Sequence, residues 1–501
     1  MLEALLEGLV LVLQWKAIAF MLLGILLGFW VGLLPGLGGA TTLALMLPFV
    51  YTMQPVEAFA FLLGMHSVTA TTGDITSVLF GVPGEAASAA TVIDGYAMAK
   101  KGEAGRALGA ALASSLVGAL VGAVALAAAI PVVRPLVLTF GSPELLMLGL
   151  VGIAFIAALS SPGGRGMLRG FLAGALGLFL ATIGQDPQAG VARYALGTLY
   201  LWQGLDLVPV LVGLFAIPEI IDLVVRGTSI ASAAPAGKLS HGAFEGVKDT
   251  FRHFWLTIRC SLIGTFIGIM PGMGGAVAQW MAYGHATHSA RNAEERRGFG
   301  QGDVRGVLGP GAANNSKEGG SLIPTIAFGV PGSTAMAILL GGFYLLGLVP
   351  GPDMLSKHLP VTFSMVWTIV IANVVTVIAC FALLNKLARL TTVRGSLLIP
   401  VILVLVFIGS YTSNNHYGDL VVTLLFGAVG YLMVLAGWPR APLVLGLVVG
   451  KIVENNLYIS MARYEAAWLT RPVVLVLIAI TVAVIVYPLF QARRRAAAAR
   501  A

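Results

Sequence analysis

The sequence predicts an all-α protein that crosses a membrane many times and is built from two repeats in opposite orientations. Three observations carry this prediction: the composition, a pair of recurring helix-breaking motifs, and the distribution of basic residues. Of the 501 residues, 58% are hydrophobic and 10% are charged, whereas soluble proteins carry about 25% charged residues. So few charges do not cover the core of a soluble protein of this length, and a bilayer is therefore expected to surround the chain.

Apolar segments recur along the whole chain and define the expected helices. Most approach the ~20 residues that a helix needs to cross a hydrocarbon layer of ~30 Å. They cover residues 108–133, 171–183, 207–225, 361–384, 397–409, 420–437 and 473–489. We expect no cleavable signal at the start, where Glu3 and Glu7 replace the usual basic residues. Cys260 and Cys380 lie far apart in apolar sequence, which predicts neither a disulfide framework nor a metal cluster.

Two motifs occur twice in the same order. "GLLPGLGGATT" begins at Gly32 and "GIMPGMGGAVA" at Gly268, while "FGVPG" begins at Phe80 and again at Phe328. A weaker third match pairs residues 166–184 with 418–437. Repeats of this kind reveal a duplicated architecture. We predict membrane repeat 1 at 1–230, a linker at 231–244, membrane repeat 2 at 245–495 and a basic tail at 496–501.

Basic residues predict that the second repeat is inverted. The interval between the two motifs has no Lys or Arg in repeat 1, whereas the matching interval of repeat 2 has four arginines. After FGVPG the bias reverses. Short cytoplasmic loops collect Lys and Arg, which places Lys100, Arg165, Arg226, Arg296, Lys386, Arg440 and Arg493 inside the cell. Met1, Glu57, Arg134, Asp353, His416 and Arg463 are then expected outside. This assignment places the N-terminus in the periplasm and the C-terminus in the cytoplasm.

The inversion and the breakers together favour a transporter. We expect about five to six spans in each repeat, together with a Gly/Pro-broken hairpin or discontinuous helix, and one extra C-terminal span. The broken segment of each repeat either turns back or crosses twice. Inverted repeats with broken helices are typical of secondary transporters. The exposed N-terminal ends of half-helices attract anions, and C-terminal carbonyls bind cations. Alternatively, Gly and Pro only permit close helix packing or a kink.

The candidate site residues follow from these ends and from the polar residues beside them. Backbone N–H groups, hydroxyls, amides and one lysine are suited to hold a carboxylate. The substrate-binding candidates are Thr41, Thr42, Gly81, Pro83, Gly84, Ser88, Thr91, Asn314, Asn315, Lys317, Gly329, Pro331, Gly332, Ser333 and Thr334. Carbonyls and intramembrane carboxyls are suited to couple Na⁺ or H⁺. The ion-coupling candidates are Pro35, Gly36, Gly38, Gly39, Asp74, Glu85, Asp94, Pro271, Gly272, Gly274 and Gly275.

Plainer alternatives stay open for several of these residues. Glu85 and Asp94 can equally lie at an interface or cap a helix. Lys317 and Glu318, followed by two glycines, indicate the mouth of a cavity or an ordinary interfacial loop. "GQGD" at 300–303 matches a short protease signature but lies in charged sequence, and no HExxH, GxSxG or Walker motif occurs. We therefore expect no enzyme activity, no organic cofactor and no metal.

The longest motifs resemble one known family. "GLLPGLGGATTLALMLPF", "TTGDITSVLFGVPGEAASAATVIDGYAMAKKGEAGRALGAA", "GIMPGMGGAVAQWMAYGHA" and "GPGAANNSKEGGSLIPTIAFGVPGSTAMAILLGGF" are similar to the TctA family, the large membrane subunit of tripartite tricarboxylate transporters. The resemblance implies an ion-driven importer of tri- or dicarboxylates such as citrate in the bacterial inner membrane. It also implies a periplasmic substrate-binding protein and a small membrane subunit of about four spans as partners. A broader similarity to elevator-type carboxylate carriers implies a moving transport domain.

The rival functions differ in whether they need an ion gradient, a binding protein or a catalytic pair. A channel moves its solute without a gradient, and a receptor-independent exporter of organic anions works without a binding protein. An intramembrane enzyme needs a catalytic pair, which the sequence does not offer. The net charge of +8 is concentrated in loops and the tail, which fits a cytoplasmic membrane surface and not nucleic acid.

Overall fold

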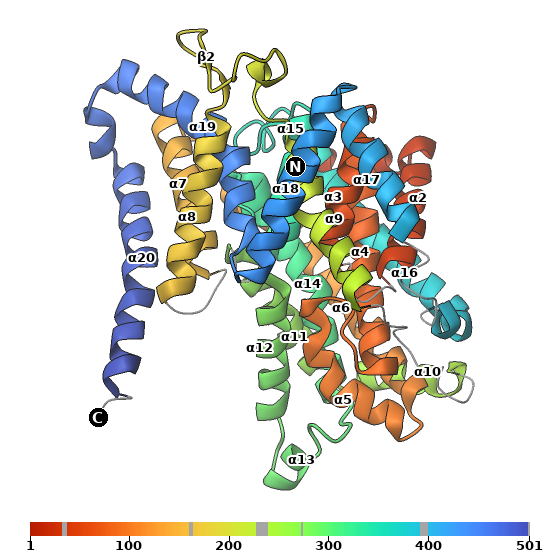
Figure 1. The fold of residues 1–501 in the computed structure, drawn as a ribbon. Helices are drawn as coiled ribbons and strands as arrows, with labels where there is room; N and C mark the ends of the chain where they lie inside the picture. The colour runs from red at the N-terminus through yellow and green to blue at the C-terminus, as the bar shows by residue number, and fades with distance from the viewer. Residues whose placement is uncertain (33–37, 160–163, 227–238, 272–273, 391–398, 499–501) are drawn as a thin grey trace.

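The computed structural model describes residues 1–32, 38–159, 164–226, 239–271, 274–390 and 399–498. Within these ranges the chain is almost entirely helical, which confirms the predicted all-α class. The described strands are β1 (Gly184–Gln185) and β2 (Ala192–Arg193), which pair antiparallel in one loop. Figure 1 shows the helices standing side by side, with this loop at one end of the bundle.

The first half of the chain contains these elements: α1 (Leu2–Val12), α2 (Trp15–Gly32), α3 (Gly39–Met46), η1 (Leu47–Val50), α4 (Pro55–Phe80), η2 (Ala86–Ser88), α5 (Ala89–Lys100), α6 (Ala104–Val137), α7 (Ser142–Leu159), α8 (Gly164–Ala181), η3 (Tyr200–Gln203) and α9 (Leu207–Arg226). The second half contains α10 (Ser240–Arg252), α11 (Phe254–Ile269), α12 (Gly274–His288), α13 (Ala293–Arg297), α14 (Arg305–Phe328), α15 (Thr334–Leu345), α16 (Leu359–Leu390), α17 (Ile399–Asn414), α18 (Tyr417–Leu435), α19 (Arg440–Tyr464), η5 (Ala467–Thr470) and α20 (Pro472–Ala498).

Five of the described helices are long and apolar enough to cross a membrane by length and composition: α2, α6, α16, α18 and α19. Shorter apolar helices accompany them, among them α7, α8, α11, α17 and the start of α20. The predicted multi-pass membrane protein is therefore confirmed at this level.

The first breaker motif lies at the turn of a helical hairpin. Its tip, residues 33–37, lies outside the described residues, but both flanks pack on α4. A methyl group on Gly32 would lie 2.1 Å from Thr72 Oγ1, and one on Gly39 would lie 2.5 Å from the His66 ring. Such short distances show that the backbone at Gly32 and Gly39 packs directly against the Thr72 and His66 side chains of α4. Because Gly32 and Gly39 reach the same level of α4, α2 descends beside α4 and α3 returns: the chain turns back.

The second breaker motif repeats this arrangement on α14. Its tip, residues 272–273, also lies outside the described residues. A methyl group on Gly268 would lie 2.3 Å from the Lys317 carbonyl oxygen, and one on Gly275 would lie 2.3 Å from Lys317 Cε. Thus α11 ends and α12 begins at the level of Lys317, and the two helices form a second hairpin.

Helices α4 and α14 form the centre of the bundle and run antiparallel. Every residue from Ala58 to Leu79 and from Gly306 to Ala327 is buried. His66 contacts Glu318, while Asp74, further along α4, contacts Asn314, which comes earlier in α14. Since each hairpin runs alongside its own central helix, the two hairpins enter from opposite ends.

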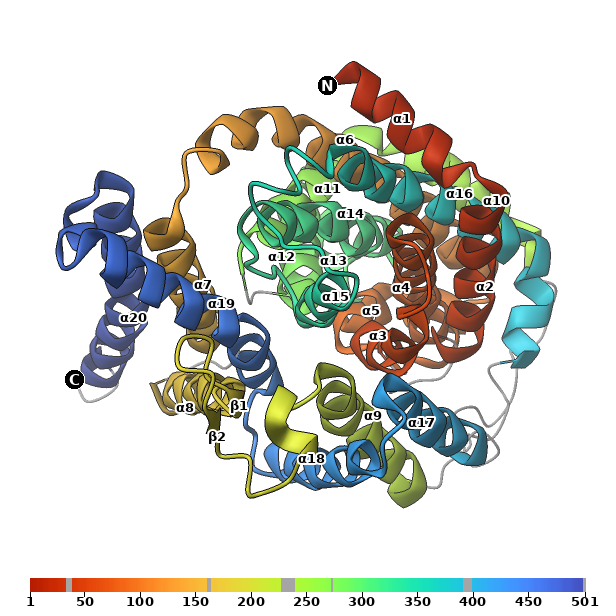
Figure 2. The same cartoon turned by 90° about the horizontal axis from the view of Figure 1, so that it is seen from above.

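The remaining helices surround this centre. Helix α6 packs on α14 and α16 on α4, whereas α8 packs on α19 and α9 on α18. Seen from above, α7, α8, α9, α17, α18 and α20 lie along one side of the central helices (Figure 2). Helix α20 stands at the outer edge, against α7.

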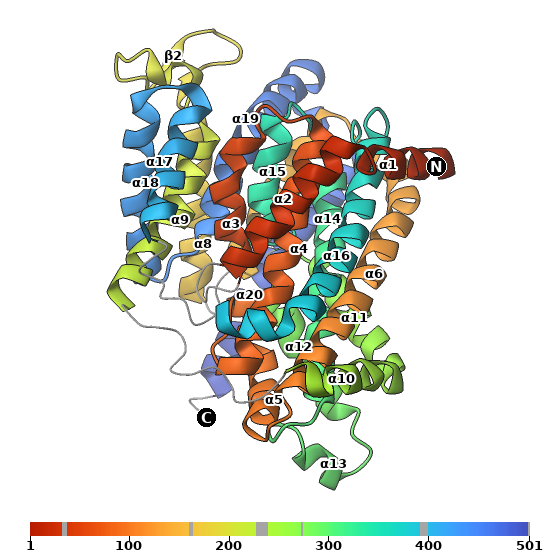
Figure 3. The same cartoon turned by 90° about the vertical axis from the view of Figure 1, so that its right-hand side faces the viewer.

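The two ends of the bundle differ in charge. α5, α10 and α13 lie at the lower end, and the β1–β2 loop at the upper end (Figures 1 and 3). The lower elements carry Lys100, Lys101, Arg296 and Arg297, which we predicted on one face of the membrane. Helix α10 begins at Ser240, so the last residues of the predicted linker 231–244 are helical; residues 227–238 lie outside the described part.

Candidate polar binding site

A cluster of ionisable and amide side chains lies where α4, α14 and both hairpins meet. It consists of His66 and Asp74 of α4, Glu85 before η2, and Asn314, Lys317 and Glu318 of α14; we call these six residues the polar centre. Five of them are buried and Glu85 is half-buried. Ionisable groups buried inside a membrane protein are costly and usually functional.

Glu318 is held by two neighbours. Its Oε2 lies 2.9 Å from Nε2 of His66, and its Oε1 accepts from Nζ of Lys317. The interaction joins the two central helices across the middle of the bundle. A buried carboxylate needs such partners, because an unpaired charge in this setting is strongly unfavourable.

The two asparagines of α14 link three helices. Asn314 donates through Nδ2 to the Ala70 carbonyl at 2.8 Å and to Asp74 Oδ2 at 3.3 Å. Asn315 donates to Thr71 Oγ1 at 2.8 Å and to Asn373 Oδ1 of α16 at 2.6 Å. These bonds fix the relative position of α4, α14 and α16 by polar groups.

Glu85 connects the first hairpin to the start of η2. Its Oε2 accepts from the Gly39 backbone N–H, the first residue of α3, at 3.3 Å. Its own N–H donates to Ser88 Oγ at 3.3 Å, which makes it a helix cap. The carboxylate therefore lies at the N-terminal end of a half-helix, where partial positive charge favours an anion.

The FGVPG segments turn the chain back toward the same level. Gly81 and Gly329 end α4 and α14 in the left-handed conformation, with φ of 68° and 65°, which glycine adopts without strain. Gly84 then returns to Gly73, donating to its carbonyl at 3.3 Å. A methyl on Gly332 would lie 2.8 Å from Ser321 Cα. Helices α5 and α15 consequently begin near the middle of the bundle.

Several predicted substrate-binding residues meet in this region. Ser88 and Thr91 are buried at the start of α5, and Ser333 caps α15 by accepting from the Met336 N–H at 3.3 Å. Thr334 is the first residue of α15. The N–H groups of Gly81, Gly84 and Gly329 already donate to carbonyls within the protein, so hydroxyls and side chains are better placed to meet a ligand. Pro83 and Pro331, which lack an N–H, lie in the two return segments.

Other predicted residues lie apart from the polar centre or outside the described part. Asp94 accepts from the N–H groups of Gly300, Gly302 and Asp303 and from the Tyr283 hydroxyl, all at 2.8–3.0 Å. It thus ties α5 to the loop before α14. Thr41 and Thr42 are buried on α3, where Thr42 Oγ1 donates to the Gly38 carbonyl at 3.1 Å. Pro35, Gly36 and Gly272 lie outside the described residues; Gly38, Pro271 and Gly274 flank the tips.

Sequence reasoning misjudged one segment and missed two side chains. Lys317 and Glu318 do not lie in an interfacial loop, because they are in the middle of buried α14. His66 opens the polar stretch HSVTATTGD but was not selected, because its partner Glu318 lies far away in the sequence. Gln279 of α12 was also missed: it is fully buried, and neither its Nε2 nor its Oε1 has a hydrogen-bond partner among the described residues.

Further unpartnered oxygens adjoin the polar centre. Asp74 Oδ1, Thr91 Oγ1, Asn314 Oδ1 and Asn315 Oδ1 are buried without a hydrogen-bond partner in the described residues. Buried polar atoms in proteins nearly always have partners. Together with Gln279, they make this the region where buried polar atoms without partners gather among the described residues. Among the described residues no group of three His, Cys, Asp or Glu side chains is suited to a metal ion.

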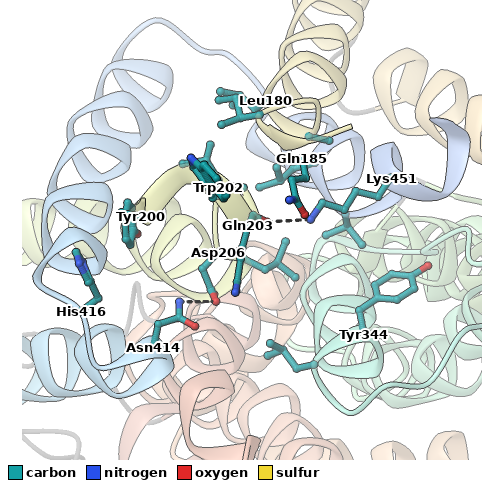
Figure 4. Close-up of a pocket in the computed structure, with 18 of the residues that line it drawn as sticks. Leu180, Gln185, Tyr200, Trp202, Gln203, Asp206, Tyr344, Asn414, His416 and Lys451 are labelled. Atoms are coloured by element: carbon teal, nitrogen blue, oxygen red, sulfur yellow. Dashed lines mark hydrogen bonds between the residues drawn. The ribbon is translucent and has the colours of Figure 1, made fainter. Parts of the chain in front are cut away.

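A pocket of about 820 Å³ lies at the end of the bundle that bears the β1–β2 loop. Its lining includes Gln185, Trp202, Tyr344 and Lys451 (Figure 4), with Lys451 Nζ donating to the Gln203 carbonyl at 3.2 Å. Burial and the nearby Asp419 raise the pKa of Tyr200, which stays protonated and donates to Asp419 Oδ1 at 2.8 Å. Tyr344 lies at the far end of α15 from Thr334, about 15 Å along the helix.

The long apolar helices around a buried, polar pair of central helices define a polytopic membrane protein. Residues 18–445 match the tripartite tricarboxylate transporter TctA family, and the chain belongs to that family. The chain is therefore a membrane component of a tricarboxylate transporter, and the family is not an enzyme family.

Two similar proteins come from Agrobacterium vitis. One is described as an uncharacterized 52.8 kDa protein in the TAR-I ttuC' 3' region; it is 33% identical over 484 residues, which cover 95% of this chain and 94% of that protein. The other, an uncharacterized protein in the TAR-II ttuC' 3' region, is 32% identical over 213 residues, or 42% of this chain and 87% of that protein. No solved structure matches the chain.

Proposed function

We propose that the protein imports a di- or tricarboxylate such as citrate across the bacterial inner membrane, driven by a cation gradient. The observation that carries the proposal is the convergence of four half-helix N-termini on one buried polar cluster. Helices α3, α5, α12 and α15 all begin within the bundle at the level of the polar centre. Helix N-termini stabilise anions, so this convergence favours a carboxylate ligand.

The two halves are proposed to be inverted repeats. Phe80 and Phe328 are 248 positions apart, and the same offset pairs His66 with Asn314 and Ala70 with Glu318. Under this exchange, the contact of His66 with Glu318 becomes the contact of Asn314 with Ala70, and both contacts occur. The antiparallel course of α4 and α14 agrees with a twofold axis in the membrane plane, the arrangement found in many secondary transporters.

Lys317 is proposed to attract the substrate, with hydroxyls and Gln279 completing the site. Its ammonium lies among the half-helix ends, beside Gly275 of α12. Ser88 and Ser333 are the N-cap residues of α5 and α15, and Gln279 offers an unpartnered amide. Neutral donors with one lysine suit a ligand that must be held and then released. The coupling ion, Na⁺ or H⁺, is proposed to bind beside the carboxyls of the polar centre and the tips of the hairpins.

The large pocket is proposed as the entry route for the substrate. It lies at the end of the bundle opposite the basic loops, which the positive-inside rule assigns to the periplasm. Lys451 and Asp206 both line it, so it offers a cationic group beside a carboxylate, and α15 runs from its lining residue Tyr344 toward the polar centre. We propose that a periplasmic substrate-binding protein delivers the carboxylate there, and that a small membrane subunit of about four spans packs against the outer helices.

An elevator motion agrees with the way the bundle is packed. Helix α3 of the first hairpin and α15 both pack on α9, and Gly341 of α15 faces the apolar side chains of Leu207 and Leu211. An apolar surface without directional bonds allows sliding. We propose that the body containing both hairpins moves against α7–α9 and α17–α19.

Reconstituted uptake tests the proposal. The complete chain, its small membrane subunit and the receptor are incorporated in proteoliposomes, and uptake of labelled citrate and other carboxylates is followed under imposed Na⁺ or pH gradients. We expect uptake that needs both receptor and gradient. Uptake without a gradient would identify a channel, and receptor-independent outward movement would identify an exporter; either outcome would reject the importer.

A further inference from the structure

We propose that Asp74, Thr91 and Asn314 form a binding site for one sodium ion, distinct from the groups that hold the carboxylate. The three residues come from α4, α5 and α14 respectively. Each is at least 99% buried, and Asp74 Oδ1, Thr91 Oγ1 and Asn314 Oδ1 each have no hydrogen-bond partner among the described residues. Since the proposed function requires a coupling ion, the physiological role of this site depends on that proposal.

The three side chains are adjacent. Asn314 Nδ2 lies 3.3 Å from Asp74 Oδ2, and the Thr91 side chain neighbours the same carboxylate. The orientation of the Asn314 amide is chemically determined, because its nitrogen faces two acceptors, Asp74 Oδ2 and the Ala70 carbonyl. A flipped amide would oppose oxygen to oxygen. The amide oxygen is therefore fixed as a free acceptor.

The charges nearby leave Asp74 without a cation of its own. Lys317 and His66 both contact Glu318, and Glu85 accepts from the Gly39 N–H. The side chains that contact Asp74 in the described part of the chain are neutral: the Asn314 amide donates to it, and the Thr91 hydroxyl lies beside it. A buried carboxylate with such weak compensation favours either protonation or a bound cation.

The donor set favours a cation over a proton. One proton on Asp74 satisfies its own oxygen and one further acceptor, whereas a cation contacts all three oxygens at once. One carboxylate with two neutral oxygens suits a hard monovalent ion, because hard cations prefer oxygen ligands. Substrate and ion sites then share α5 and α14. We expect the bound cation to raise the affinity for the carboxylate by charge balance, and thermodynamic linkage then requires the carboxylate to raise the affinity for the cation by the same factor.

Thermal unfolding of the full-length protein in detergent tests the site without any substrate. We expect NaCl to raise the unfolding midpoint relative to choline chloride at equal ionic strength. Loss of an outer-shell partner alone typically weakens metal binding by about 10–100-fold. We therefore expect Thr91→Val, which removes a direct oxygen at constant volume, to weaken the apparent Na⁺ affinity about tenfold or more. Asp74→Asn should abolish the Na⁺ effect.

Two matched variants separate ligation from folding. Thr91→Ser keeps the hydroxyl and should keep the Na⁺ effect. Thr368→Val removes a buried hydroxyl on α16 that donates to the Ser364 carbonyl, and it should leave the Na⁺ effect unchanged. A wild-type midpoint equal in sodium and choline, or equal Na⁺ affinities in Thr91→Val and Thr91→Ser, would overturn the proposal. Uptake driven by a pH gradient alone, with no Na⁺ binding, would reject this site but not the proposed importer. Na⁺ binding without carboxylate uptake would support this site and reject the proposed importer.

Discussion

Replacing Lys317 with methionine removes the only lysine of the polar centre while keeping a long, unbranched side chain. Glu318 then retains only His66, at 2.9 Å. Both side chains of the lysine–glutamate pair are 7% exposed, so the charge left behind stays buried. At about 3 Å and an effective dielectric constant of about 20, the lost attraction is ~5 kcal/mol. Breaking one side of a buried pair typically destabilises a protein by about 3–5 kcal/mol.

Removing both charges should cost less than removing one. In Lys317→Met with Glu318→Gln, the uncompensated charge of Glu318 is removed as well, and we expect the double variant to recover most of the stability that Lys317→Met loses. The free energy of unfolding is measured by SDS titration in mixed micelles for wild type, both single variants and the double variant. Lys357→Met serves as the control, because Lys357 is a surface lysine whose side chain is 72% exposed, and it should change stability by less than about 0.5 kcal/mol.

Carboxylate binding separates the structural role of Lys317 from its role toward substrate. We expect the double variant to fold and yet fail to bind citrate, because the positive charge is gone. Additive losses in the two single variants would refute the inferred coupling of Lys317 with Glu318. Normal citrate binding by a folded double variant would refute the assignment of Lys317 to the substrate.

Three further predictions follow from the packing and the loops. Asp94→Asn should lower the unfolding midpoint and retain gradient-driven uptake, because Asp94 binds the 300–303 loop; loss of ion coupling in a folded variant would contradict this. Gly118→Ala should destabilise the protein strongly, because the new methyl would lie 2.0 Å from the Ala312 carbonyl oxygen. Gly284→Ala meets nothing within 4 Å and should stabilise α12 by up to about 1 kcal/mol. Thermal unfolding of the two variants measures both effects. Lys451→Glu should raise the substrate concentration for half-maximal uptake without changing the unfolding midpoint, and an unchanged value would remove the pocket from the route.

Hydropathy found the outer helices but not the central pair. α6, α16 and α18 are long and apolar, and the apolar segments 108–133, 361–384 and 420–437 predicted them directly, whereas α19 was not among the predicted segments. α4 and α14 do not pass the same test, although their central residues are all buried. Their polar side chains bond to one another across the bundle, so protein and not lipid surrounds them. Composition measures affinity for lipid, and it therefore cannot recognise a helix that lipid never touches.

Repetition predicted the site better than residue type did. The two breaker motifs and the two FGVPG segments indicated which parts of the chain approach each other, and Asp74, Thr91, Asn314 and Lys317 lie where those parts meet. Residue type alone also selected Asp94, whose partners are backbone N–H groups of a sequence-distant loop. Three of its four donors depend on how residues 300–303 fold around it, and the fourth is the Tyr283 hydroxyl of α12, which no local pattern encodes. Gln279 was missed for the opposite reason, since its isolation becomes visible only when its neighbours are known.

The charges of the polar centre bear on how the proposed carrier would use its gradient. Three carboxylates, of Asp74, Glu85 and Glu318, face one lysine and one histidine. A di- or tricarboxylate entering such a centre alone would add negative charge to a region that is already anionic, and burial makes that addition costly. Cations that enter with the substrate remove this cost, so substrate binding and ion binding become mutually dependent. Coupling then follows from charge balance at the binding site: a carboxylate without its cations would bind too weakly to be moved, and cations without a carboxylate would stabilise only the resting state.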